Sequence, residues 1–156
     1  MDLQTEQAVW RRVRGPGGVT AREALLPEKL EALILEEQSR AQELRALSGR
    51  MNGPQRGRLS RIAARSEARS RSLGALHYLL TGRRLRLQKA PLPRPAPTPE
   101  ALRQAALSLR EAVRSYESLA REFEDYAQDF SRYADETRSQ LAAVTDILQS
   151  RLTAER

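Results

Sequence analysis

Apolar side chains recur every three or four residues in four stretches of this 156-residue chain, with polar positions between them. This spacing places the apolar residues of one stretch on one face of an α-helix. The pattern therefore predicts two helices within residues 27–82 and two more within residues 99–153. In chain order, the apolar faces are Leu30, Leu33, Ile34, Ala41, Leu44 and Leu47; Leu59, Ile62, Ala63, Leu73, Leu76 and Leu80; Leu102, Ala105, Leu109, Val113, Tyr116 and Leu119; and Phe130, Tyr133, Ala134, Leu141, Val144 and Leu148.

The residues between these stretches predict how the helices are connected. Asn52-Gly53-Pro54 is a tight break, so the first two helices form a hairpin, which ends at Gly82. Prolines at alternate positions from 91 to 99 make residues 83–98 an extended crossover that can run the length of a bundle. Thr98 is the expected N-cap of the third helix. The turn of the second hairpin carries neither Gly nor Pro, and we place it near Glu122–Asp125.

Residues 1–18 are predicted to precede the bundle as a short helix, residues 5–14, followed by the turn Gly15-Pro16-Gly17-Gly18. Trp10 and Val13 are expected to pack against the main body. Residual apolar faces at Trp10 and Leu25-Leu26 also suggest pairing into a homodimer. Residues 19–156 are expected to form one domain, the size that a chain of this length supports.

Composition narrows the class of protein. Apolar residues make up 40% of the chain and aromatic residues only 4%, which favours helices over strands. The chain has no cysteine, so thiol catalysis, zinc–thiolate sites and disulfides are excluded. Its polar start and the lack of a long apolar run predict a cytoplasmic protein without a membrane partner.

Two segments resemble the ferritin-like superfamily, in particular its rubrerythrin-type di-iron domains. They are Leu30-Glu31-Ala32-Leu33-Ile34-Leu35-Glu36-Glu37 and the stretch from Arg61-Ile62-Ala63 to Leu79-Leu80-Thr81-Gly82. The resemblance covers residues 27–153, and the segment Ala8-Val9-Trp10-Arg11-Arg12-Val13 is similar to short bacterial members. It implies a four-helix bundle of two hairpins, with metal ligands inside.

The resemblance also assigns the ligand positions of this chain. The first hairpin aligns Glu37 with a ligand glutamate and Ser66 and Arg69 with the Glu and His of the second helix. The second hairpin repeats these positions 72 and 71 residues later. The six family-equivalent positions are therefore Glu37, Ser66, Arg69, Leu109, Thr137 and Gln140, of which only Glu37 is able to bind a metal.

These replacements imply a degenerate di-iron site and a non-catalytic structural or interaction module with no cofactor, whose protein partner the sequence does not identify. The alternative is a rubrerythrin-type oxidoreductase that binds iron or manganese through Glu37 and unconventional neighbours. Those neighbours would be Glu36, Glu67 or Glu136, each close in sequence to a ligand position.

In place of the metal, the helical spacing predicts a polar layer inside the bundle. Arg69 follows the stripe of Ile62 and Ser66, so it should face inward at the level of Glu37. We expect a Glu37–Arg69 ion pair, with Ser66, Thr137 and Gln140 completing the layer. The alternative is that Arg69 reaches along the helix surface to solvent while Glu37 is half exposed.

The second helix is strongly basic. Residues 55–86 carry nine arginines and one acid, in a chain whose formal net charge is +7. Arg58, Arg61 and Arg65 lie at helical neighbour spacing and form a candidate site for non-specific polyanions. The alternative is a solvated helix face balanced by acids of other helices. His77, the only histidine, has no nucleophile partner in the sequence, so we assign it no catalytic role.

Overall fold

A computed structural model of the chain describes residue 4 and residues 23–86, 91–92 and 94–155. The short helix predicted over residues 5–14 and the turn at residues 15–18 lie outside this part. The described residues form helices and no strand, which confirms the all-α class. The elements are a 3-10 turn at Glu23–Leu25, α2 at Leu26–Gly49, α3 at Gly53–Thr81, α4 at Thr98–Glu122, a second 3-10 turn at Glu124–Tyr126, and α5 at Ala127–Ala154.

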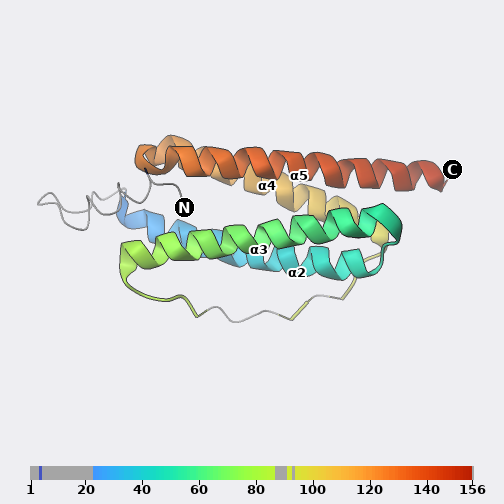
Figure 1. Cartoon of the computed structure of the whole chain (residues 1–156), viewed down its shortest axis with the longest axis horizontal. Helices are drawn as coiled ribbons and strands as arrows, with labels where there is room; N and C mark the ends of the chain where they lie inside the picture. The colour runs from blue at the N-terminus through green and yellow to red at the C-terminus, as the bar shows by residue number, and fades with distance from the viewer. Residues whose placement is uncertain (1–3, 5–22, 87–90, 93, 156) are drawn as a thin grey trace, which may run out of the picture.

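The helices pack as two antiparallel hairpins, α2 with α3 and α4 with α5 (Figure 1). Helix α3 ends at one end of the bundle and α4 begins at the other, where α2 stops (Figure 1). Two contacts agree with this placement, in which α2 and α4 run in opposite directions. Lys29 at the start of α2 pairs with Glu122 at the end of α4, with Nζ and Oε2 2.7 Å apart. Arg50, which follows α2, contacts Thr98 at the start of α4.

Helix ends lie where backbone chemistry favours a break. Gly53 opens α3 with φ +62°, and Gly82 ends it with φ +71°, both in the left-handed region that favours glycine. The Gly82 N–H donates to the Tyr78 carbonyl at 2.7 Å, which closes the last turn of α3. The turn between α4 and α5 lies at Phe123 to Tyr126, one residue from its predicted place.

The prediction that Thr98 caps α4 with its side chain is wrong. No side-chain hydrogen bond caps this helix, and the Thr98 hydroxyl accepts a hydrogen bond from Arg50 Nη2 at 2.8 Å. The same nitrogen donates to the Ala96 carbonyl at 2.7 Å. The hydroxyl therefore helps to hold the end of the crossover against α2.

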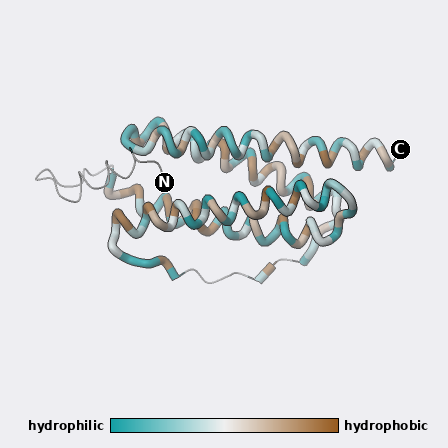
Figure 2. The backbone as a smooth tube through the Cα atoms, viewed as in Figure 1, coloured by the Kyte–Doolittle hydropathy of each residue, from teal (hydrophilic) through white to brown (hydrophobic). Residues whose placement is uncertain are grey.

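Apolar residues recur along every helix (Figure 2) and meet in two clusters inside the bundle. The proximal cluster, next to the α4–α5 turn, contains Leu26, Leu30, Leu33, Ile34, Leu73, Leu76, Ala112, Tyr116, Leu119, Phe123, Tyr126, Phe130, Tyr133 and Ala134. The distal cluster, next to the α2–α3 turn, contains Leu44, Leu47, Met51, Leu59, Ile62, Ala63, Leu102, Ala105, Leu109, Val144 and Ile147.

Most residues on the apolar faces predicted from the sequence are buried in the structure, with some exceptions. Leu80, Leu141 and Leu148 are only partly buried, because each lies at the margin of a cluster. Ile147, which was not predicted, is fully buried. Leu26 belongs to the proximal cluster and needs no partner chain to cover it, whereas Leu25 is exposed. Trp10 lies outside the described residues.

Candidate functional site

The centre of the bundle, between the two apolar clusters, holds a buried ion pair. Glu37 from α2 is fully buried and Arg69 from α3 is 2% exposed. Arg69 Nε donates to Glu37 Oε1 at 3.1 Å, and Arg69 Nη2 donates to Oε2 at 3.4 Å. The pair predicted from helical spacing is therefore present. Arg69 does not reach along the helix surface to solvent.

Two further groups contact the same carboxylate. Arg40, one turn along α2 and 3% exposed, places Nη1 2.9 Å from Glu37 Oε2 as an ion pair without hydrogen-bond geometry. Tyr116 on α4 donates its hydroxyl to Oε1 at 2.7 Å. Arg40 is itself held by Ser108, whose hydroxyl and carbonyl accept from Nε and Nη2 at 3.0 and 3.3 Å. One carboxylate therefore balances two guanidinium groups.

Arg69 also binds the residues that face it from α3 and α5. Its Nη2 donates to Gln140 Oε1 at 2.7 Å and to Ser66 Oγ at 3.3 Å. Its Nη1 donates to Glu136 Oε2 at 3.5 Å. Glu136 is 25% exposed and also accepts from Arg65 Nη2 at 2.6 Å. The partly exposed Glu136 is thus a second carboxylate, which offsets the excess positive charge of the buried arginines.

The charge states of the layer follow from these contacts. Burial alone would raise the pKa of Glu37, but Arg40, Arg69 and the Tyr116 hydroxyl stabilise the carboxylate more and hold its pKa below the ordinary value of 4.5. Burial raises the pKa of Tyr116 well above 10.0, and the adjacent Glu37 carboxylate raises it further. The layer at neutral pH therefore contains a carboxylate, a neutral phenol and two guanidinium cations.

The lowered pKa of Glu37 makes stability depend on acid pH. A carboxyl group whose pKa is lower in the folded state stabilises the fold above its unfolded pKa, and this contribution is lost as pH falls through the folded value. We therefore expect wild type and Glu37→Gln to converge in unfolding free energy as pH falls below about 4.5. Urea unfolding of both proteins at a series of pH values measures this difference. A difference that stays constant down to about pH 3 would contradict the pKa assignment.

One predicted member of the layer, Thr137, has a different role from that expected, and Leu109, a family-equivalent position on a predicted apolar face, lies outside the layer. Thr137 is fully buried, but its hydroxyl donates to the Tyr133 carbonyl of its own helix at 2.6 Å and does not bind Arg69. A buried threonine in a helix readily bonds the carbonyl one turn back, and this satisfies its hydroxyl locally. Leu109 lies in the distal apolar cluster. Of the six family-equivalent positions, four form the network: Glu37, Ser66, Arg69 and Gln140.

Sequence reasoning missed Arg40 as a member of this layer. The signal was present, because Arg40 lies three residues after Glu37 and one before the apolar Ala41, on the inward face of α2. Tyr116 was placed on an apolar face, and its hydroxyl was not assigned a partner. Glu136 was considered as a metal ligand, whereas in the structure it accepts from Arg65 and Arg69.

The side chains around Glu37 do not fit a di-iron site. Its nearest charged neighbours are two arginines, which have no lone pair to donate to a metal. Within the described ranges, no three His, Asp or Glu side chains cluster closely enough to hold an ion. Glu67, a proposed substitute ligand, instead pairs with Arg45 at the surface, with Oε2 and Nη2 2.8 Å apart.

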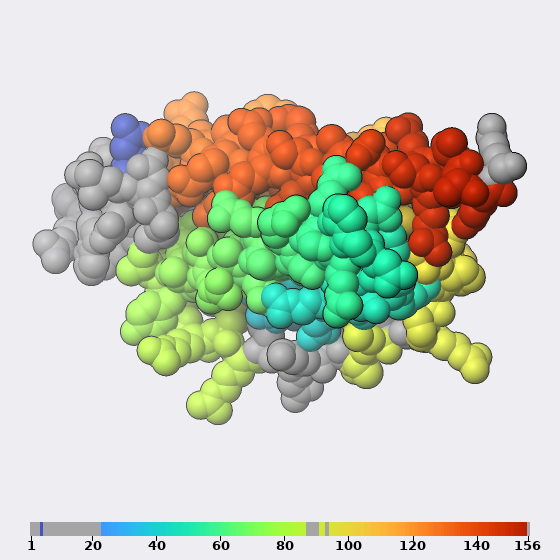
Figure 3. Space-filling view, turned by 45° about the vertical axis from the view of Figure 1, so that its right-hand side comes forward, coloured from blue at the N-terminus to red at the C-terminus, as the bar shows by residue number. Residues whose placement is uncertain are grey.

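The candidate polyanion site at Arg58, Arg61 and Arg65 is largely neutralised. Side chains of α5 lie directly against those of α3 (Figure 3). Arg58 Nη1 donates to Asp146 Oδ2 at 2.9 Å, and Arg65 donates to Glu136. Arg61 alone of the three has no ion pair with any residue that the structure describes. The alternative prediction, a face balanced by acids of another helix, is the better description.

His77 is engaged in structural contacts. Its ring is 2% exposed, and Nε2 lies 2.9 Å from Glu31 Oε1. On the other side, Thr81 Oγ1 lies 3.4 Å from Nδ1 and donates to the His77 carbonyl at 2.9 Å. Both ring nitrogens therefore have partners. The Thr81 hydroxyl gives its proton to the His77 carbonyl and not to the ring, so His77 does not act on it as a base.

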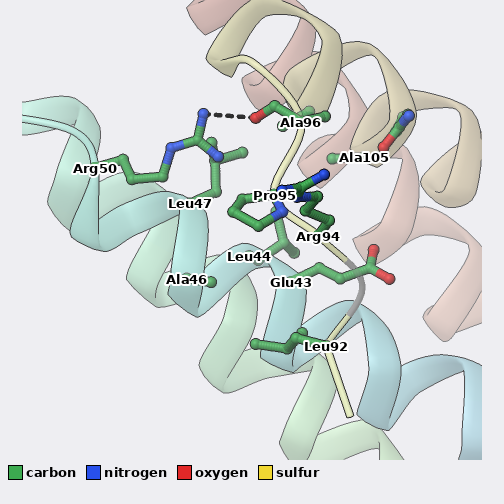
Figure 4. A pocket seen from close by; sticks show the side chains of 12 residues that line it. Glu43, Leu44, Ala46, Leu47, Arg50, Leu92, Arg94, Pro95, Ala96 and Ala105 are labelled. Carbon is green, nitrogen blue, oxygen red and sulfur yellow. Dashed lines mark hydrogen bonds between the residues drawn. The ribbon is translucent and has the colours of Figure 1, made fainter. Parts of the chain in front are cut away.

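A small pocket of about 190 Å³ lies under the crossover, between α2 and the start of α4 (Figure 4). Its apolar wall includes Leu44 and Leu47 from α2, Leu92 and Pro95 from the crossover, and Ala105 from α4. The bond from Arg50 to the Ala96 carbonyl closes one side (Figure 4). The polar side chains beside it, Glu43, Arg50, Arg94 and Gln104, are exposed and belong to different segments. The pocket therefore holds no catalytic constellation.

Comparison with known proteins identifies no relative: no family model, no curated protein and no solved structure matches the chain. None of the helices in the described ranges is both long and apolar enough to cross a bilayer.

Proposed function

We propose that this chain is a non-catalytic interaction module of ferritin-like ancestry, in which arginine cations replace the metal of a di-iron site. The observation that carries the proposal is the contact of Arg69 with Glu37, Ser66 and Gln140 in the middle of the bundle. All four residues stand at positions that the family resemblance assigns to metal ligands. A guanidinium supplies a fixed positive charge and five donors, so it compensates a buried carboxylate without a metal.

The connections between the helices support the same ancestry. Ferritin-like bundles join two helical hairpins through one long crossover and place functional side chains on the facing helices. This chain has two hairpins, and the connection between α3 and α4 joins opposite ends of the bundle (Figure 1). Inside it, hydrogen bonds link Glu37 of α2, Arg69 of α3, Tyr116 of α4 and Gln140 of α5.

The remaining reactive groups support a non-catalytic role. The chain has no cysteine, and its only histidine is held between Glu31 and Thr81. The hydroxyl groups of Ser66, Thr137 and Tyr116 are each bonded within the layer or to their own helix. The Tyr116 hydroxyl donates to the Glu37 carboxylate, but the lowered pKa of Glu37 and the raised pKa of Tyr116 keep the proton on the phenol, so Glu37 does not activate it.

Metal analysis tests the proposal. The chain, expressed in medium with added iron and manganese and freed of any affinity tag, should contain only substoichiometric metal by plasma mass spectrometry. The physical reason is that two cations already surround Glu37 and repel a third. About two metal ions per chain, the stoichiometry of a di-iron bundle, would overturn the proposal and favour the oxidoreductase alternative.

A further inference from the structure

The outer face of the first hairpin carries a groove of about 720 Å³ beside the start of the crossover. Its lining comes from three segments: Ile34 and Gln38 of α2, residues 84–86 of the crossover, and Ser70, Arg71, Gly74, Ala75 and Tyr78 of α3. The volume lies within the range of about 300–1,000 Å³ that is typical of ligand sites. None of its lining residues belongs to the Glu37 layer.

The groove is positively charged and has no internal counter-ion. Arg71, Arg84 and Arg86 line it and are exposed, and no lining residue is acidic. None of these three arginines forms an ion pair with the described part of the chain. Arg58 and Arg65 on the other side of α3, by contrast, are paired with acids of α5. The groove therefore gathers three arginines without an acidic partner among the described residues, one from α3 and two from the crossover, whereas two of the three arginines first singled out in the sequence are paired.

The groove also offers an aromatic ring and open space next to it. Tyr78 is 48% exposed although it is a large aromatic residue. Gly74, one turn earlier on α3, leaves open space, because a Cβ placed there would meet no atom within 4 Å. Leu85, which also lines the groove, is partly buried. A flat ring therefore has room to lie against Tyr78, with charged groups within reach of the arginines.

We infer that this groove binds a short segment of single-stranded nucleic acid, with a base against Tyr78 and phosphates on Arg71, Arg84 and Arg86. Grooves that combine an arginine track with an exposed aromatic ring bind single strands in this way, because every base has a flat face and every nucleotide a phosphate. A duplex keeps its bases stacked on one another and leaves Tyr78 without a partner. An acidic peptide satisfies the arginines but has no group that requires the ring.

This inference rests on the proposed role as an interaction module and names the class of partner. The probe is a fluorescein-labelled oligothymidylate about a dozen nucleotides long, longer than the groove requires. Anisotropy titrations at several salt concentrations give the affinity and its salt dependence. Three phosphate contacts predict a slope of log K against log salt of about −2, since each contact on a single strand contributes about −0.7.

Two variants test the groove itself. Arg71→Gln/Arg84→Gln/Arg86→Gln should abolish measurable binding, because it removes all three phosphate contacts. Tyr78→Ala should weaken binding about 5- to 100-fold and leave the slope unchanged, because it removes stacking and no phosphate contact. The matched control, Arg58→Gln/Arg61→Gln/Arg65→Gln, removes the same number of charges from the side that faces α5. It should keep most of the affinity and the slope of the wild type.

Several results would overturn the inference: no binding at low salt, equal weakening by the control variant, or an unchanged affinity after Tyr78→Ala. Competition by polyglutamate as strong as that by unlabelled oligothymidylate would assign the groove to an acidic protein instead. Circular dichroism and thermal unfolding of each variant show whether the fold is intact. Stoichiometric metal in a chain that still binds the oligonucleotide would refute the metal-free proposal and leave the groove assignment in place.

Discussion

Replacing Glu37 with leucine is expected to lower the free energy of unfolding by about 3–5 kcal/mol. Among the residues that the structure describes, Glu37 is the only carboxylate that contacts both Arg40 and Arg69. Without it, two guanidinium groups that are 3% and 2% exposed stay buried, and in the described part of the chain only Glu136, which is partly exposed, still contacts Arg69. A buried charge without a counter-ion costs far more than the intact pair contributes.

Urea unfolding measures this loss as a lower midpoint at an unchanged slope. The control is Glu67→Gln, which breaks the surface pair with Arg45, whose side chains are 38% and 52% exposed. An exposed pair contributes about 0–1 kcal/mol because water and salt screen it. If the two substitutions cost the same, Glu37 would not be the buried counter-ion that the structure shows.

Leu109→Glu is expected to lower the unfolding free energy by several kcal/mol, even though it restores a carboxylate at a family ligand position. Leu109 is fully buried within the distal cluster, among leucines, alanines and valine. A carboxylate placed there loses its hydration and gains no partner. The packing contacts of the leucine side chain are lost as well. Burial will raise the pKa of the new carboxyl group, so the loss should grow with pH.

The matched control is Leu109→Gln, which has nearly the same shape as the glutamate but no charge. The two variants should be similar in acid and should diverge as pH rises above the ordinary glutamate pKa of about 4.3, until it reaches the raised pKa of the introduced group in the folded protein. Added Mn²⁺ should not restore the stability of Leu109→Glu, because Arg69 and Arg40 occupy the space around Glu37. Restoration by the metal would show that a di-iron site can be rebuilt here, against our account.

The sequence was sufficient to predict the helices and the Glu37–Arg69 ion pair, for one physical reason. Helical periodicity fixes which residues share a face, and a tight hairpin turn fixes which residues of two helices lie at one level. Glu37 and Arg69 are therefore related by local rules alone. The same periodicity placed Ser66 and Gln140 inside, and both contact Arg69.

Contacts between the two hairpins could not be predicted in the same way. Arg58 and Asp146 are 88 residues apart, and Arg65 and Glu136 are 71 apart. No local pattern shows that α5 brings acids to those arginines, so the sequence left a possible anion site beside the interpretation of a face balanced by acids. The hydroxyl of Thr137 was misassigned for the opposite reason, because a bond within its own turn satisfied it before any distant group.

The most direct test of the central claim, that Arg69 is the counter-ion of Glu37, is the coupling free energy between these residues. A double-mutant cycle measures it, from the urea unfolding of wild type, Glu37→Leu, Arg69→Leu and the double variant. Our account predicts that the double variant is more stable than the sum of the single losses implies, by more than about 1 kcal/mol, because each single variant loses the Glu37–Arg69 attraction and the double variant loses it only once. Additivity within about 0.5 kcal/mol would contradict it and would mean that each residue has a different partner.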